Sequence, residues 1–145
     1  MHNDFYASGF IYHPRSQQIL LQQLTTANNE PTWLLFGGEG LQKETPEETF
    51  ARIISKILKI KLKPSLIFPV YKYFHEEMKV DHHISYARIG KLEKFPPTKT
   101  TIFAWFNFKQ VQKLNLSSQT KHDIMVAQRV IDSATRRSLG QQTID

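Results

Sequence analysis

The stretch that decides the fold is GGEGLQKETPEETFARIISKILKI, residues Gly37–Ile60. It begins with two adjacent glycines, Gly37 and Gly38, which predict a tight backbone turn or a close approach of the backbone to a ligand. A polar loop then leads into a helix, and the N-terminus of such a helix is a natural site for phosphate groups. The stretch therefore predicts a phosphate-binding loop, and the side chains of the helix decide what chemistry follows.

The helix in this stretch has clear start signals. Thr45 is the predicted N-cap, Pro46 is the first helical residue, and Glu48 completes a capping box. The helix is expected to end near residues 59–63, before Pro64. Apolar residues recur at helical spacing and predict one buried face, formed by Phe50, Ile53, Ile54, Ile57 and Leu58.

Length and composition indicate a single basic domain. The chain has 145 residues, and we expect one domain over residues 1–137 followed by a flexible tail over residues 138–145. With 19 Lys and Arg against 13 Asp and Glu, the net charge of +6 favours anionic partners such as nucleotides. The absence of cysteine excludes disulfides and thiolate chemistry. No apolar run approaches the ~20 residues that span a bilayer, so we expect no membrane association and a cytoplasmic location.

The rest of the chain reads mainly as strands. Strands on both sides of one central helix, with a further helix at the end, predict an α+β fold. In that fold a mixed β-sheet lies between helices as an α/β/α sandwich. The expected strands are 5–13, 19–24, 33–36, 66–75, 81–89 and 102–107, and the expected later helices are 108–114 and 119–137.

The order of elements and the glycine–loop–helix stretch resemble the Nudix (MutT-like) superfamily. The box of that family reads G-x5-E-x7-R-E-U-x-E-E-x-G-U, where U is a bulky aliphatic residue. Gly38, Glu44 and Arg52 stand in register with its first three defined positions, and Ile54 and Ile60 occupy aliphatic positions. The resemblance spans roughly the whole chain and implies the α/β/α sandwich described above.

The helix departs from the family pattern at its acidic positions. Ile53, Lys56 and Ile57 replace the three glutamates of the box, and Lys59 replaces its late glycine. Nudix enzymes hydrolyse nucleoside diphosphates linked to another group, and they use divalent cations to do so. Mg²⁺ prefers carboxylate oxygens, whereas isoleucine offers no ligand and an ammonium group repels a cation. The resemblance therefore implies that metal-dependent catalysis is lost, and we assign no catalytic residue and no metal ligand.

Acids elsewhere offer two alternative metal sites. Glu39 and Glu44, together with loop carbonyls, are one candidate site for Mg²⁺ or Mn²⁺. Glu44, Thr45 and Glu48 are more simply interpreted as supports of the loop and helix, and the resemblance implies that Glu44 pairs with Arg52. The second candidate set lies at a predicted hairpin tip, where its members are also expected to be solvated, and strand alternation would separate two of them. It comprises His75, Glu76, Glu77, Asp81, His82 and His83.

The predicted phosphate site does not require a metal. Lys56 replaces a metal-binding position, and its ammonium group could neutralise a diphosphate directly, although it also reads as an ordinary exposed helix lysine. The residues assigned to phosphate or nucleotide binding are Gly37, Gly38, Glu39, Arg52 and Lys56. Aromatic residues available to stack on a base, or simply to fill the core, are Tyr6, Tyr12, Tyr71, Tyr73, Phe74 and Trp105.

The sequence thus predicts a Nudix-like protein with a degenerate box. We expect impaired catalysis and a role as a nucleotide- or phosphate-binding module or as a protein-interaction module. The alternative is an active hydrolase of dinucleoside polyphosphates or nucleoside triphosphates that uses acids outside the box with Mg²⁺ or Mn²⁺. Nucleic acid is a weaker candidate partner, because the basic residues are scattered along the chain.

Overall fold

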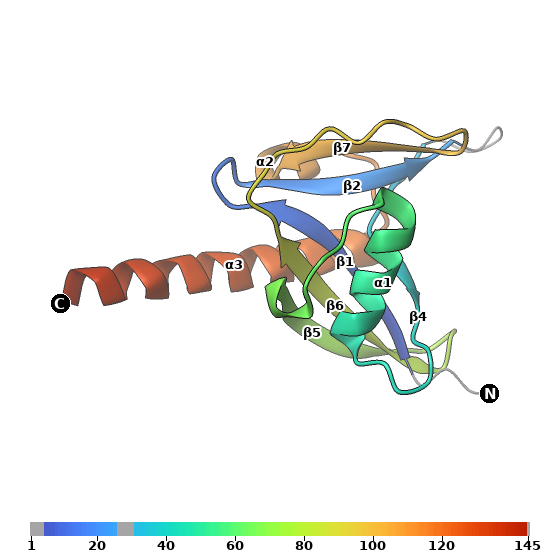
Figure 1. Cartoon of the computed structure of the whole chain (residues 1–145), viewed down its shortest axis with the longest axis horizontal. Helices are drawn as coiled ribbons and strands as arrows, with labels where there is room; N and C mark the ends of the chain where they lie inside the picture. The colour runs from blue at the N-terminus through green and yellow to red at the C-terminus, as the bar shows by residue number, and fades with distance from the viewer. Residues whose placement is uncertain (1–4, 26–30, 145) are drawn as a thin grey trace.

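The computed structural model describes residues 5–25 and 31–144. Its elements follow the order predicted from the sequence (Figure 1). The strands are β1 (Phe5–His13), β2 (Gln18–Leu24), β3 (Trp33–Leu34), β4 (Phe36–Glu39), β5 (Ile67–His75), β6 (Val80–Arg88) and β7 (Thr101–Asn107). The helices are α1 (Pro46–Leu58), the 3-10 turn η1 (Pro64–Leu66), α2 (Phe108–Val111) and α3 (Ser118–Ile144).

Strand β1 is the centre of a mixed sheet. One edge of β1 pairs in parallel with β6 from Phe5 to Tyr12. Its other edge is shared, because β4 pairs with residues 6–9 and β2 pairs with residues 11–13, both antiparallel. Strand β2 then pairs with β7 and with the short β3, and β5 pairs with β6. Strands β1 and β2 thus form one hairpin, and the hairpin predicted for β5 and β6 is confirmed.

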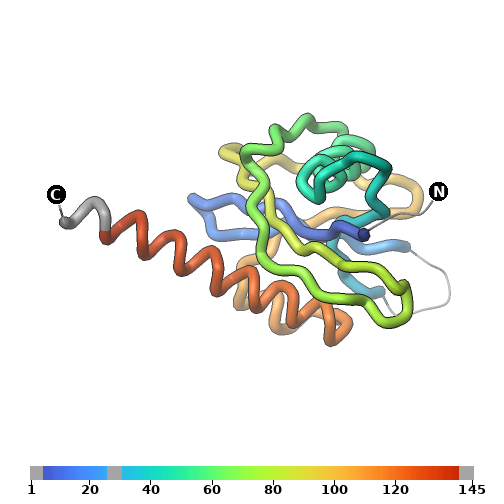
Figure 2. Tube along the Cα trace, turned by 90° about the horizontal axis from the view of Figure 1, so that it is seen from below, coloured from blue at the N-terminus to red at the C-terminus, as the bar shows by residue number. Residues whose placement is uncertain are grey.

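The two faces of the sheet are covered by different helices. Figure 2 shows α1 on one side of the sheet and α3 on the other. Alternation along β1 supplies both layers, since Ile11 packs with the α1 side and Phe10 packs with the α3 side. This arrangement confirms the predicted α/β/α sandwich with a mixed sheet between helices.

Helix α1 begins as its sequence predicts. The hydroxyl of Thr45 accepts a hydrogen bond from the Glu48 backbone at 3.1 Å, and the Glu48 carboxylate accepts one from the Thr45 backbone at 2.9 Å. The helix ends at Leu58, and Lys59 follows in the left-handed region with φ of 60°. A lysine therefore occupies a backbone conformation that favours glycine.

Three local predictions need correction. Gly37 and Gly38 lie in strand β4, and no described glycine has positive φ, so the predicted tight turn at this pair is wrong. Strand 33–36 is interrupted at Leu35, because residues 33–34 pair with β2 whereas residues 36–39 pair with β1. Helix α3 continues to Ile144, so residues 138–144 of the expected tail are helical. Their flexibility, and the single domain over residues 1–137, stay predictions.

Among the described helices, none combines the length and the apolar composition that crossing a membrane requires.

The left-handed backbone of Lys59 generates the first prediction. Substituting Lys59→Gly should raise the free energy of unfolding by about 0.5–1 kcal/mol, because glycine adopts positive φ without steric cost. Denaturant unfolding measures the change. Lys63→Gly is the matched control: Lys63 has φ of −81°, so this substitution should leave stability unchanged or lower it. A loss of stability in Lys59→Gly would contradict the proposed backbone strain.

Candidate functional site

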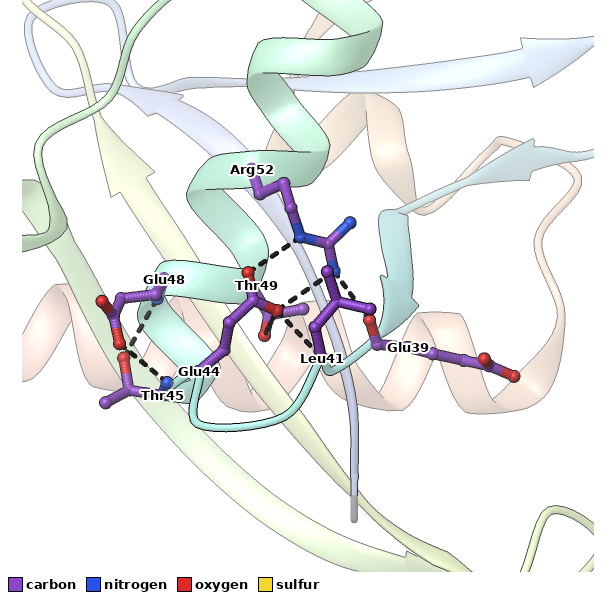
Figure 3. Close-up of polar contacts among 7 residues, drawn as sticks. All are labelled: Glu39, Leu41, Glu44, Thr45, Glu48, Thr49 and Arg52. Atoms are coloured by element: carbon purple, nitrogen blue, oxygen red, sulfur yellow. Dashed lines mark hydrogen bonds and ion pairs between the residues drawn. The ribbon is translucent and has the colours of Figure 1, made fainter. Parts of the chain in front are cut away.

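The loop before α1 is held by one ion pair. The guanidinium of Arg52 donates from Nε to Glu44 Oε2 at 2.8 Å and from Nη2 to Glu44 Oε1 at 3.2 Å (Figure 3). Nη2 also donates to the backbone oxygen of Glu39 at 2.8 Å, which ties the end of β4 to the helix. Arg52 thus joins strand, loop and helix, and the predicted pairing of Glu44 with Arg52 is confirmed.

Glu44 is the acceptor at the centre of this network. Its Oε1 also accepts from the backbone N–H of Leu41 at 2.8 Å and from the hydroxyl of buried Thr49 at 2.9 Å. The hydrogen bond from Arg52 is the largest cause that lowers the pKa of Glu44 to about 2, and the bonds from Leu41 and Thr49 act in the same direction. Both carboxylate oxygens accept hydrogen bonds within the protein, so a metal at the site considered with Glu39 would compete with Arg52 for Glu44.

The two glycines allow close packing on opposite faces of the sheet, Gly38 against α1 and Gly37 against Ser8 of β1. A Cβ atom on Gly38 would lie 2.7 Å from Cδ1 of Ile53, and one on Gly37 would lie 2.5 Å from Oγ of Ser8. Both distances are below ordinary carbon contact, so only glycine fits without movement of a neighbour. The predicted turn is thus replaced by close packing within the protein, and the close approach to a ligand stays a prediction.

The three positions at which the Nudix box has glutamates lie in two different environments. Ile53 is 6% exposed and belongs to the core between α1 and the sheet. Ile57 is partly buried and packs against the same core, whereas Lys56 is exposed. Within the described chain Lys56 forms no ion pair. Two of the three positions are therefore hydrophobic packing positions, and the third carries a solvated positive charge.

The structure separates the predicted phosphate-binding residues into two groups. Gly37 and Gly38 are backbone positions of β4, next to Glu39, whose backbone oxygen is held by Arg52. The remaining amino group of Arg52 makes no hydrogen bond with the described residues and points away from the network in Figure 3. Lys56 lies one helical turn further along α1. Their common role in phosphate binding stays a prediction.

The acid and histidine set of the β5–β6 hairpin is divided by the sheet. His82 contacts Tyr6 on the α3 side, whereas His83 packs against Phe5, so the predicted separation of the two histidines is confirmed. Lys72 pairs with Asp81 at 3.9 Å. Within residues 5–25 and 31–144, no three His, Asp or Glu side chains are placed to hold a metal ion together.

A polar network on the α3 face was not predicted from the sequence. His82 bridges Ser8 and Tyr73, with Nε2 2.7 Å from the serine hydroxyl and Nδ1 2.9 Å from the tyrosine hydroxyl. Burial lowers the pKa of His82 to about 4, with the neighbouring His75 and His83 as smaller causes, and burial raises the pKa of Tyr73 to about 12. The bridge is therefore neutral at physiological pH, and it sits beside the Tyr6 ring.

A second polar contact fixes α3 to the sheet. Tyr71 donates to the buried carboxylate of Asp123 at 2.5 Å, and Gln119 donates to the same oxygen at 2.9 Å. Burial raises the pKa of Asp123, which the two hydrogen bonds only partly oppose. The alternation of Tyr71 and Tyr73 in the sequence indicates that both side chains lie on one face of the sheet. It does not indicate their partners, Asp123 and His82, which lie on other elements.

The depressed pKa of Glu44 generates the second prediction. Glu44→Gln should lower the free energy of unfolding at pH 7 by about 1–2 kcal/mol, since it removes a charge-assisted pair whose arginine is partly exposed to solvent. Because the folded-state pKa lies below the ordinary value, this stability is present above about pH 4.5 and is lost as pH falls toward 2.

Urea unfolding between pH 7 and pH 2 should show the difference between the two proteins shrinking in that window. Glu76→Gln, at an exposed position of the β5–β6 turn, is the control and should follow wild type at every pH. A constant difference across the range would contradict the role assigned to the Glu44 charge.

Solved structures share this arrangement over most of the chain. The NUDIX domain of Shewanella oneidensis NrtR, solved with ADP-ribose, matches with a TM-score of 0.68 and 14% identity, covering 90% of each chain. A mutT/nudix family protein from Listeria innocua matches with a TM-score of 0.65 and 15% identity, covering 96% of this chain and 98% of that one. A MutT/nudix family protein from Enterococcus faecalis matches with a TM-score of 0.67 and 17% identity, covering 91% of this chain but only 63% of that one.

No sequence-family model and no curated protein matches the chain. The identities to the solved structures are low, so the likeness concerns the three-dimensional arrangement of the elements. That arrangement, with the loop and helix in the register of the Nudix box, identifies the protein as one with the Nudix fold.

Proposed function

We propose that this protein is a cytoplasmic Nudix-fold module that binds a nucleotide or another phosphorylated small molecule without hydrolysing it through a metal. In this proposal the loop and α1 bind the ligand, but α1 lacks the carboxylates with which the family's hydrolases bind a metal. A protein-interaction role, with no nucleotide, is the other non-enzymatic reading, and the experiment below distinguishes the two.

The observation that carries the proposal is the packing of Ile53. At this position a hydrolase of the family would present a carboxylate. Here the isoleucine side chain is 6% exposed and fills the space that a side chain on Gly38 would need. A glutamate there would need water or a cation to satisfy its charge, whereas isoleucine is stabilised by burial. Ile57 packs on the same core, so the apolar character extends over a full turn of α1.

The charges that remain on this part of α1 suit an anion. Lys56 is exposed and unpaired within the described chain, and Arg52 keeps one amino group outside its internal network. The overall charge of +6 adds a field of the same sign. The fold shared with the ADP-ribose-bound domain of NrtR makes a nucleoside diphosphate sugar a reasonable first probe.

A metal-dependent hydrolase acting on dinucleoside polyphosphates or nucleoside triphosphates is the alternative. It would need carboxylates outside the box, and Glu39, Glu47 and Glu48 are the acids nearest in sequence. Glu48 caps the helix and Glu44 pairs with Arg52. Among the residues that the structure describes, no three His, Asp or Glu side chains are grouped so that they could hold a metal ion. The observations therefore favour binding over hydrolysis.

Ligand binding without metal is the third prediction. ADP-ribose or a nucleoside triphosphate should raise the melting temperature of the protein in the presence of EDTA, because bound ligand stabilises the folded state by mass action. Lys56→Glu should abolish the shift, since it replaces the solvated cation with an anion. Differential scanning fluorimetry with and without Mg²⁺ measures both effects.

Lys63→Glu is the matched control, because it makes the same charge change at an exposed position beyond the end of α1. Its shift should equal that of wild type. No shift with any nucleotide would favour the protein-interaction role, and a shift that appears only with Mg²⁺ or Mn²⁺ would favour the hydrolase.

A further inference from the structure

A groove of about 720 Å³ lies at the opposite end of α1 from the Glu44–Arg52 network. It is bounded by the β1–β2 turn, by residues 60–62 after α1, and by residues 88–91 after β6. In Figure 1 these segments lie to the left of α1, whereas the loop that precedes α1 lies below it. The groove is thus separate from the predicted phosphate-binding residues of β4 and α1.

The floor of the groove is apolar. It is lined by Ile60, Leu62, Leu66 and Ile89, and Leu66 remains 42% exposed in the folded protein. The volume lies within the range of about 300–1,000 Å³ that small-molecule sites occupy. A groove of this size fits the apolar body of a small ligand better than it fits the flat surface of another protein.

The rim of the groove is basic. Arg15, Lys61 and Lys91 line it, all three are exposed, and none forms an ion pair with the residues that the structure describes. Arg88 also lines the groove, but its guanidinium carbon lies 5.8 Å from the centroid of the Phe68 ring, which packs on the α3 side of the sheet. Glu93 is the acid that faces them, so the rim carries an excess of positive charge.

A buried histidine adds a directed donor to the same groove. His13 is 6% exposed, and its Nδ1 accepts from the Ser16 backbone N–H at 3.2 Å, with the Ser16 hydroxyl 2.7 Å from the same nitrogen. A ring nitrogen that accepts a hydrogen bond carries no proton in the neutral ring, so the proton resides on Nε2.

The second nitrogen of His13, Nε2, is accessible to solvent, and His13 lines the groove. Nε2 makes no hydrogen bond with the described residues. Every buried side-chain nitrogen or oxygen among those residues has a hydrogen-bond partner, so Nε2 is not buried. Nε2 is therefore reached by solvent, and the groove is the space that His13 lines. Its N–H is a fixed donor beside an apolar floor and a cationic rim.

We propose that this groove is a second binding site, which takes a phosphate monoester with an apolar body. The apolar chain or ring would cover the leucine and isoleucine floor, and the phosphate would lie among Arg15, Lys61, Lys91 and the Nε2–H of His13. A dianionic phosphate matches several cations and one neutral donor better than a carboxylate does. The site is independent of the nucleotide binding proposed above.

Calorimetric titration of the full chain with hexyl phosphate tests the site, with inorganic phosphate and hexanol as the two half-ligands. Hexyl phosphate should bind more tightly than either half-ligand. Lys61→Glu should weaken it by about tenfold or more, because one charge-assisted contact is replaced by repulsion. Lys63→Glu, two residues further along the chain, should change the affinity less than about twofold.

The result is distinguishable from nucleotide binding, because saturating ADP-ribose should leave the affinity for hexyl phosphate unchanged. A ¹H–¹⁵N spectrum of the histidine rings adds a readout in the unmutated protein, and the His13 Nε2–H signal should move on addition of hexyl phosphate. Equal affinity for hexyl phosphate and either half-ligand, an unaffected Lys61→Glu variant, an unmoved His13 signal, or displacement by ADP-ribose would each overturn the proposal.

Discussion

Close packing of α1 against the sheet is the constraint on which the rest of the structure depends. A Cβ atom on Gly9 would lie 1.9 Å from the Ser85 backbone oxygen and 3.0 Å from the Phe50 ring, and one on Gly38 would meet Ile53. Glycine at these positions lets the apolar face of the helix reach strands β1 and β4. The Glu44–Arg52 pair then fixes the loop that joins β4 to α1.

That packing also bears on the proposed loss of metal-dependent catalysis, because Ile53 and Ile57 stand where the Nudix box has glutamates. The chain replaces acids with isoleucine at two positions that border the core, and burying one such side chain stabilises the fold by about 1.5–3 kcal/mol. The same replacement removes the oxygens that a hard cation prefers. Burial of an isoleucine and binding of a metal by a carboxylate are therefore alternatives at these two positions, and the proposed function follows from the first.

Much of the fold was predictable because its signals are local. The cap at Thr45, the helical spacing of apolar residues and the register of Glu44 with Arg52 all act within about a dozen residues, and the structure confirms them. The double glycine was misassigned, because the sequence shows that a residue is small without showing what approaches it. The His82 bridge and the groove beside His13 depend on partners far apart in the chain, such as Ser8 with His82, and only the sheet register brings these together.

The most direct measurement of the central claim is an assay for nucleotide hydrolysis by the purified full chain, with Mg²⁺ and Mn²⁺ in separate series. The substrates are ADP-ribose, a dinucleoside polyphosphate and a nucleoside triphosphate. Product release should be no faster than in protein-free blanks for every substrate and metal. Metal-stimulated release that rises in proportion to protein concentration would contradict it.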